Sequence, residues 1–247
     1  MRGKGSNLIC LNIITIVKDD YFAISRTIKS VKNASQPEDM TLRHLICTGN
    51  SDENLINHIL SISSDLVEIV SKDDSGIYNA MNKGLANVES GWVMFLNGGD
   101  TLNSIDSLEI IFNCIKKTNC VFLQLQTATG TKISPQKKYS RLQHYLGRSM
   151  HAHPSFLFKY DPHKIIPFDE NLKILGDFKF ILQNTKKSKI DFKPHVVSVF
   201  EGGGISSTNL ETLVREANAV RIQLCPNIFL LPFVRLWNLK VRFFSHL

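Results

Sequence analysis

Short apolar runs alternate with amphipathic segments through the first hundred residues. Apolar runs rich in β-branched residues occupy 11–17, 42–47, 66–70 and 92–96, and each has the length of a buried strand. The segments between them carry apolar residues at helical spacing, namely Ile24, Ile28 and Val31, then Leu55, Ile59 and Ile62, then Ile77, Met81, Leu85 and Val88. This alternation predicts an α/β chain with a mostly parallel sheet and helices on both faces.

The second half of the chain is less regular. Strands are predicted over 121–130, 153–159 and 196–200, the last running into a glycine-rich loop. A helix is predicted to begin near Asp177, and from about Glu211 the pattern is again helical, with interruptions at Pro226 and Pro232.

Polar clusters follow each of the first four predicted strands. In parallel sheets the ligand binds beyond the carboxyl ends of the strands, so these clusters are expected at one edge. Any one of them alone is typical of a turn, and the four together predict a ligand crevice. They are Lys18-Asp19, Thr48-Gly49-Asn50, Lys72-Asp73-Asp74 and Asn97-Gly98-Gly99-Asp100.

The stretch "FLNGGD" ends in an aspartate directly beyond a strand. Asp100 could hold Mg²⁺ or Mn²⁺ bridged to phosphate oxygens, and Gly98 and Gly99 would let a phosphate or sugar approach the backbone. A type I′ or II′ hairpin turn built on the two glycines is the alternative. The hexapeptide by itself leaves both readings open.

Two stretches together resemble family 2 glycosyltransferases. "DDSGIYNAMNKG", which begins at Asp73, is followed shortly by "FLNGGD". The pair is most similar to the branch that builds bacterial exopolysaccharides such as colanic acid and amylovoran. "NIITIV", "HPSFLF", "LGDFKFIL" and "GGGISSTN" extend the resemblance over about residues 8–225.

The resemblance implies a GT-A fold over 1–210, followed by a helical tail at 211–247. Within the fold, about 8–115 would bind the nucleotide-sugar and about 116–210 the acceptor. The implied reaction is an inverting transfer of a sugar from a nucleotide-sugar, a UDP-sugar in the first place, with Mn²⁺ or Mg²⁺. The implied acceptor is a lipid-linked saccharide of bacterial exopolysaccharide, capsule or O-antigen synthesis.

The resemblance also assigns donor-binding positions. Asp100 stands where the metal- and diphosphate-binding motif ends, and Asn97 and Gly99 replace acids that other members carry beside it. Asp74 matches an acid that holds the nucleotide near the ribose or uracil. Thr15 and the Lys18-Asp19 pair lie where the first strand meets the base.

Asp177 falls where the family places its catalytic base, which takes the proton of the attacking acceptor hydroxyl. Without the family, a helix N-cap is the favoured interpretation of this residue. Two departures stand beside it. Thr48 replaces the acid that normally reads the base, and Asn79 replaces an aspartate before Ala80. The first makes a catalytically weak or inactive nucleotide-sugar-binding scaffold the alternative function.

Acceptor contacts are expected from the second half of the chain. His151 and His153 could form half a metal site, but no third ligand is evident, so acceptor contact or a plain loop role is favoured for His153. Gly203 and Gly204, in the run after Glu201, could cradle phosphate or form a loop that closes on donor or acceptor.

Composition adds two points. The five cysteines form no C-x-x-C pair, which indicates buried thiols in a reducing compartment. The basic and then apolar N-terminus favours a first core strand over a signal peptide, because Asn12 and Thr15 interrupt the run. A cytoplasmic protein is therefore expected.

The net charge of +7 is unevenly spread, since 110–160 and 217–247 contain no Asp or Glu. Such asymmetry indicates an anionic partner. The tail after 226 mixes aromatic and basic residues, which suits a helix on an anionic membrane surface at the inner face of the plasma membrane, or a helix docked on the core. Nucleic acid is the disfavoured partner, because no stacking platform or reading motif accompanies the lysines.

Overall fold

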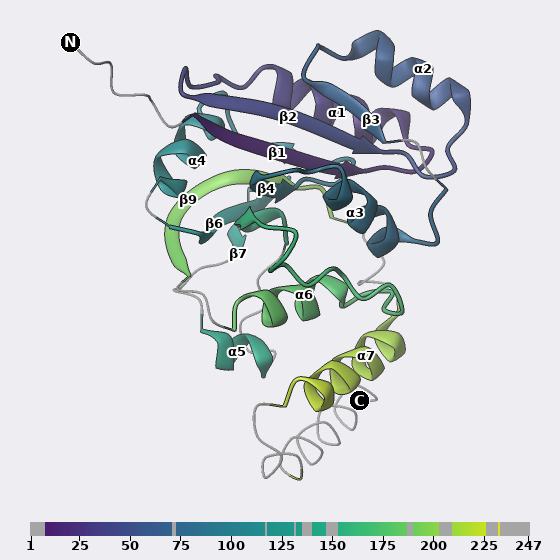
Figure 1. Ribbon diagram of the computed structural model, residues 1–247. Helices are drawn as coiled ribbons and strands as arrows, with labels where there is room; N and C mark the ends of the chain where they lie inside the picture. The colour runs from purple at the N-terminus through teal and green to yellow at the C-terminus, as the bar shows by residue number, and fades with distance from the viewer. Residues whose placement is uncertain are drawn as a thin grey trace, which may run out of the picture.

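The computed structural model describes residues 8–70, 73–116, 118–130, 132–134, 140–146, 153–186, 190–202, 209–225 and 232. Within these ranges the chain forms one nine-stranded sheet in the order β3-β2-β1-β4-β8-β6-β9-β5, with β7 paired to β6. Figure 1 shows β1 to β4 crossing the upper part of the molecule and the long β9 bending around its side.

The first half alternates strand and helix as its pattern predicts. Its elements are β1 (Ile9–Ile16), α1 (Tyr21–Lys32), β2 (Met40–Cys47), α2 (Glu53–Ile62), β3 (Val67–Val70), α3 (Ile77–Ala86) and β4 (Gly91–Phe95). The second half contains β5 (Thr101–Leu102), α4 (Ser107–Ile115), β6 (Cys120–Thr127), β7 (Lys132–Ser134), α5 (Arg141–Tyr145), β8 (Phe156–Tyr160), α6 (Gly176–Asn184), β9 (Asp191–Phe200) and α7 (Leu210–Gln223).

Strand β1 lies at the centre of a parallel group. It pairs in parallel with β2 and with β4, and β2 pairs in parallel with β3. Strand β8 then pairs antiparallel with both β4 and β6, so the sheet is mixed. The parallel group brings the carboxyl ends of β1, β2 and β4 to one edge, as the sequence predicts.

Aspartates begin two of the helices at this edge. Asp20 accepts a hydrogen bond from the Ala23 N–H at 2.8 Å and caps α1. Asp52 accepts one from the Leu55 N–H at 2.9 Å and caps α2. Each side chain satisfies a backbone donor that the first helical turn leaves free, and its negative charge suits that end of the helix dipole.

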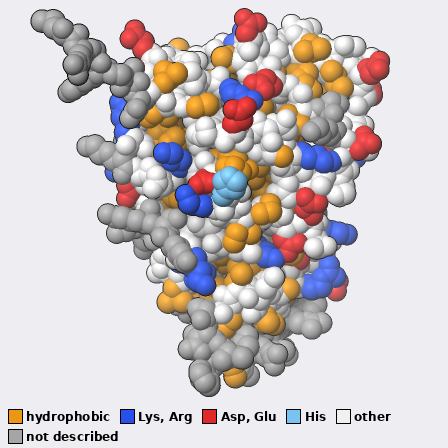
Figure 2. Space-filling model, viewed as in Figure 1, with side chains coloured by type: hydrophobic (Ala, Val, Ile, Leu, Met, Phe, Trp, Pro, Cys, Tyr) orange, Lys and Arg blue, Asp and Glu red, His pale blue; other side chains and the backbone are white. Residues whose placement is uncertain are grey.

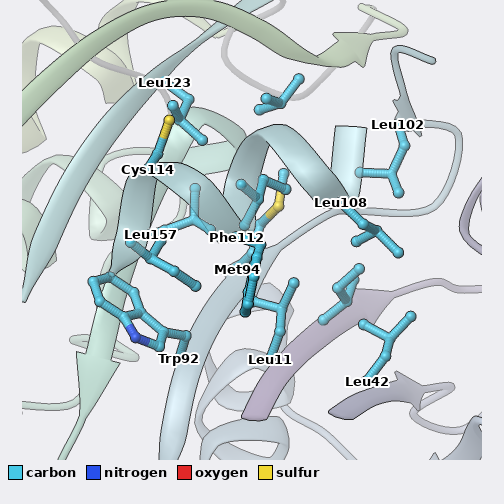
Figure 3. Packing of buried hydrophobic residues seen from close by; sticks show 14 of the residues in the cluster. Leu11, Leu42, Trp92, Met94, Leu102, Leu108, Phe112, Cys114, Leu123 and Leu157 are labelled. Carbon is cyan, nitrogen blue, oxygen red and sulfur yellow. The ribbon is translucent and has the colours of Figure 1, made fainter. Parts of the chain in front are cut away.

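Helices cover both faces of the sheet. On one face Leu11, Met94 and Leu157 pack against Leu108 and Phe112 of α4 (Figure 3). Beside them, α1 and α2 bury Ile24, Ile28, Leu55 and Ile59 against Val17 and Ile46. The opposite face packs against α3 and α6, with a separate cluster joining α5, α6 and α7.

The second half differs from the sequence-based expectations. The segment predicted as a strand over 153–159 begins as a 3₁₀ turn (His153–Ser155), and only then becomes β8. Pro154 lacks the N–H that a ladder needs, which accounts for the late start. Helix α4 is not among the predicted elements, although its apolar residues fill the core shown in Figure 3.

All five cysteines are free thiols, and Cys47, Cys114 and Cys120 are buried. Burial raises the pKa of the Cys47 thiol to about 12, so it stays protonated at neutral pH. Among the described residues no helix has the length and hydropathy required to cross a membrane. The predicted tail over 226–247 lies outside the described residues except for position 232.

Helix α3 packs so closely on β1 that a methyl group at Gly84 has no room. An added Cβ would lie 2.5 Å from Ile14 Cγ2 and 3.1 Å from Cys47 Sγ. Alanine normally stabilises a helix interior by about 1 kcal/mol relative to glycine. Here we expect Gly84→Ala to lower the free energy of unfolding by about 1–3 kcal/mol in urea denaturation. The neighbouring Lys83→Ala is the control, and a Gly84→Ala protein as stable as the wild type would contradict the close packing.

Candidate active site

The loops after β2 and β3 meet through Asp74 and Gly49. Gly49 has φ +56°, and a Cβ there would lie 2.1 Å from Asp74 Oδ2. The Asp74 N–H donates to Asn50 Oδ1 at 2.9 Å, and Asp74 Oδ1 accepts from the Gly76 N–H at 3.1 Å. The Asp74 carboxylate therefore lies beside Gly49, just beyond the end of β2.

Thr48 directly follows β2 and is fully buried. Its Oγ1 has no hydrogen-bond partner among the described residues. A buried hydroxyl without a partner is unfavourable, so this atom is a candidate for contact with a bound group.

Asp19, after β1, is exposed. Among the described non-glycine residues it alone has a positive φ, of 51°. It follows β1 at the same edge.

The hydroxyl of Thr15, which is predicted to lie near the base, is enclosed in the core of the structure. Thr15 is fully buried, and its Oγ1 donates to the Leu96 carbonyl at 2.6 Å and contacts His44 Nε2 at 2.8 Å. Burial lowers the pKa of His44 to about 4, so the imidazole is neutral and its Nε2–H donates to Thr15. The two side chains form a polar bridge between β1 and β2 inside the core.

Asp100 is a buried carboxylate with one free oxygen. The residue is 3% exposed. Oδ1 accepts a hydrogen bond from the Glu201 N–H at 3.0 Å, whereas Oδ2 has no partner among the described residues. Burial raises the pKa of Asp100 to about 6, against the lowering effect of the Glu201 N–H.

The two glycines before Asp100 are explained by packing within the chain. A Cβ at Gly99, which has φ +97°, would fall 1.8 Å from Glu201 Oε2. A Cβ at Gly98 would lie 3.0 Å from Val17 Cγ2. Glu201 and Val17 thus occupy the positions that side chains at 99 and 98 would take, and diphosphate contact at the two glycines stays a prediction. Glu201 also pairs with Arg26 of α1.

A side-chain relay connects the Asn97 turn to Asp177. Asn97 Nδ2 lies 3.0 Å from His153 Nε2, and His153 Nδ1 lies 3.3 Å from Asp177 Oδ2. The amide nitrogen can only donate, so Nε2 accepts its hydrogen bond and the Nδ1–H points at the Asp177 carboxylate. The sequence predicts an acceptor contact for His153, and the structure brings it between the predicted metal turn and the predicted base.

Asp177 does not cap its helix. It stands in the first turn of α6, whose N-cap position is Leu175. Among the described hydrogen bonds, its Oδ1 accepts only the N–H of the adjacent Phe178, at 2.7 Å. Its side chain is 23% exposed. The carboxylate is therefore partly open to solvent and free of the capping role that is the alternative interpretation.

The sequence-based reasoning missed what the motif on α3 does. Asn82 Nδ2 donates to the Phe168 carbonyl at 3.0 Å, and Asn82 Oδ1 accepts the Phe168 N–H at 2.9 Å. The Tyr78 hydroxyl donates to the Ile174 carbonyl at 2.6 Å. These side chains hold the irregular segment that leads to Asp177. Their spacing of four on a helix, which gives Tyr78 and Asn82 a common face, was the available signal.

Asn79 also contacts this segment. Its Nδ2 donates to Glu170 Oε2 at 2.8 Å, and its Oδ1 accepts the Ser75 N–H at 3.2 Å. Aspartate, which the resembling family carries here, has no N–H to donate. The asparagine therefore fits the glutamate that faces it.

The Asp100 turn offers oxygen ligands to a hard cation. Asp100 Oδ2 and Asn97 Oδ1 are both buried and without partners among the described residues. No cluster of three or more His, Cys, Asp or Glu side chains suited to a metal occurs in the described part of the chain. Mg²⁺ and Mn²⁺ tolerate so few protein ligands when water and phosphate oxygens complete the shell. Gly203, Gly204 and His151 lie outside the described residues.

Comparisons with solved structures establish the fold. The chain superposes on TarS of S. aureus in complex with UDP-GlcNAc with a TM-score of 0.65 at 13% identity, covering 85% of this chain and 66% of TarS. Mannosyltransferase PcManGT from Pyrobaculum calidifontis, in complex with GDP-Man and Mn²⁺, gives a TM-score of 0.61 at 11% identity, over 92% of this chain and 73% of that one. The chain has a GT-A fold.

Sequence comparison gives a partial match. No model of a known protein family matches the chain. An uncharacterized glycosyltransferase of Mycobacterium tuberculosis is 27% identical over 96 residues, or 39% of this chain. The match spans 36% of that relative's length. The sequence relative is named a glycosyltransferase, and the structural neighbours include a mannosyltransferase.

The raised pKa of Asp100 predicts a pH-dependent stability. The ordinary pKa of an aspartate, 3.8, applies to Asp100 in the unfolded chain. Between about pH 4 and about pH 6 Asp100 therefore binds more protons in the folded protein than in the unfolded chain. The free energy of unfolding of the metal-free protein should therefore fall by up to about 3 kcal/mol through this group as the pH rises through that window. Asp100→Asn should remove this slope.

Urea denaturation from pH 4 to pH 8 with a chelator present measures the difference between variant and wild type. Asp106→Asn, at an exposed aspartate before α4, is the control and should run parallel to the wild type. Parallel curves for Asp100→Asn as well would show that the carboxylate is not held in its protonated form by burial.

Proposed function

We propose that this GT-A protein is an inverting, metal-dependent glycosyltransferase that uses a nucleotide-sugar, with a UDP-sugar as the first candidate. The observation that carries the proposal is the relay in which His153 joins Asp177 to the Asn97–Asp100 turn. It brings the candidate base and the candidate metal and diphosphate site together at one edge of the sheet. The UDP-GlcNAc and GDP-Man bound by proteins of the same fold support this class of donor.

In this reaction Asp177 takes the proton of the acceptor hydroxyl as its oxygen bonds to the anomeric carbon. The bond from that carbon to the diphosphate breaks on the opposite face, which inverts the configuration. The His153 Nδ1–H orients the carboxylate towards the acceptor side. Asp74 and the loop of Thr48 hold the nucleotide, with Asp19 at the end of β1 beside them.

A Mn²⁺ or Mg²⁺ ion held through Asp100 Oδ2 would supply positive charge to the leaving diphosphate. Asp100 itself must be ionised for this role. Because its pKa in the metal-free protein is about 6, metal affinity is expected to weaken as the pH falls below that value.

The proposed acceptor is a lipid-linked saccharide of bacterial polysaccharide synthesis, reached from the cytoplasmic face of the membrane. The basic and aromatic composition of 226–247 supports a surface location. Nucleic acid is not proposed as a partner. On the face seen in Figure 2, Lys and Arg side chains are mixed with Asp and Glu side chains and form no single-sign stripe.

One observation favours a second candidate function, a nucleotide-sugar-binding scaffold without turnover. Thr48 replaces the acid expected to read the base, and its hydroxyl is fully buried. The scaffold would bind the nucleotide-sugar without cleaving it, so no free nucleotide would be produced.

Transfer activity and its base are tested together. Nucleotide release from UDP-, GDP- and dTDP-sugars, with Mn²⁺ and a lipid-linked acceptor, should identify one preferred donor. For that donor Asp177→Asn should lower kcat by roughly 10²- to 10⁴-fold, because the amide cannot accept the proton, while nucleotide affinity stays unchanged.

Asp65→Asn, at an exposed aspartate before β3, is the matched control and should keep wild-type kcat. Full activity of Asp177→Asn would rule out this residue as the base. Stoichiometric nucleotide binding without release from any donor would favour the scaffold.

The tail is tested by flotation with vesicles. The full chain should float with vesicles that contain anionic lipid and stay behind with neutral ones, since its basic residues bind anionic headgroups. A chain ending at 225 should lose this difference. Equal flotation of the two chains would disprove a membrane role for 226–247.

A further inference from the structure

The carboxylate of Glu216 is buried in α7, and the hydrogen bonds described for it all go to the segment before α6. Oε1 accepts the Lys173 N–H at 2.7 Å. Oε2 accepts the N–H groups of Ile174 and Leu175 at 3.0 and 2.9 Å. The residue is 6% exposed. Three consecutive backbone donors thus converge on one carboxylate that is shielded from water, which is an arrangement of strong, charge-assisted hydrogen bonds.

Glu216 also binds the residue at which α6 starts. Its N-cap residue, Leu175, has no side chain able to accept a hydrogen bond from the first turn. The Glu216 carboxylate instead binds the N–H of Leu175 itself, at the end of the helix where negative charge is favourable. Asp177 stands in the turn that follows, so the anion that fixes the start of its helix comes from α7.

The same peptide segment is held from its other side by α3. The Ile174 N–H donates to Glu216 while the Ile174 carbonyl accepts from Tyr78. At Gly176 a Cβ would lie 2.6 Å from the Tyr78 ring. The backbone immediately before Asp177 is therefore clamped between α3 and α7.

Helix α7 is anchored firmly enough to act as a support. Val220 packs with Phe178 and Leu182 of α6 in one apolar cluster. Arg221 Nε donates to the Tyr145 carbonyl at 3.0 Å, and the Tyr145 hydroxyl donates to the Arg221 carbonyl at 2.6 Å. Figure 1 shows α5, α6 and α7 gathered on the side of the sheet away from α2.

We propose that Glu216 is a positioning residue for Asp177, and that the helix leading to the C-terminal tail is thereby part of the catalytic apparatus. The inference rests on the proposed function, in which Asp177 is the base. Glu216 takes no part in proton transfer. Its role is to hold the peptide groups of 173–175 so that the Asp177 carboxylate stays within reach of both His153 and the acceptor, where a displacement of about 1 Å costs on the order of 10²-fold in rate.

The test compares Glu216→Gln with Glu211→Gln, which removes an exposed carboxylate from the first turn of the same helix. In Glu216→Gln the side-chain amide offers one oxygen to three donors and turns an N–H₂ group towards them. We expect kcat to fall roughly 10- to 100-fold in this variant, with unchanged donor KM and unchanged stoichiometry of UDP binding. Glu216→Asp, which keeps the charge on a shorter side chain, should have an intermediate kcat. Glu211→Gln should match the wild type.

Wild-type kcat in Glu216→Gln would overturn the inference. So would a loss of rate in Glu216→Gln and Glu216→Asp that only follows a loss of UDP-binding stoichiometry, because that result describes a general folding role. Amide hydrogen exchange at 173–175, expected to be faster in Glu216→Gln, examines the clamp independently of turnover. A wild-type protein that transfers no sugar from any donor would refute the proposed function, whereas unchanged exchange at these amides would refute the clamp itself.

Discussion

The parallel pairing of β1 with β2 on one side and β4 on the other is the constraint on which the site depends. Together with the parallel pairing of β3 with β2, it brings four strand ends to one edge, so that short loops suffice to gather Asp74, Asp100 and Asp19 there. Parallel strands need long crossover connections, and the helices that make those connections supply both faces of the core. The donor edge therefore follows from the same pairing that closes the core.

The acceptor side has a different physical basis. Asp177 is reached through residues 161–175, a stretch with no regular element, and its backbone groups are satisfied by side chains of other elements. Asn82 and Tyr78 bind it from α3, and Glu216 binds it from α7. The buried residues of this segment, Phe168, Ile174 and Leu175, need such partners because an unpaired peptide group would be unfavourable there. Precision at Asp177 is thus built from distant parts of the chain.

Periodicity predicted the first half well, because short apolar strands and amphipathic helices there repeat in a simple order. Local pattern failed where a long-range contact decides the outcome. The Thr15 hydroxyl bonds His44 of β2 and the carbonyl of Leu96 after β4, and both contacts join segments that are distant in sequence. Glu216 resembles any polar residue of an amphipathic helix, and only the tertiary fold shows that it meets 173–175.

Asn79 and Glu170 form a matched pair across two elements that are far apart in sequence. Replacing Asn79 by the aspartate of the family that the sequence resembles would put a second carboxylate opposite that of Glu170. The amide N–H that now donates to Glu170 would be gone. Changing position 170 alone would leave the amide without its acceptor. The two sites are therefore expected to change together in evolution and to show non-additive effects when mutated singly and in combination. Any attempt to graft the family's consensus onto this chain must treat them as one unit.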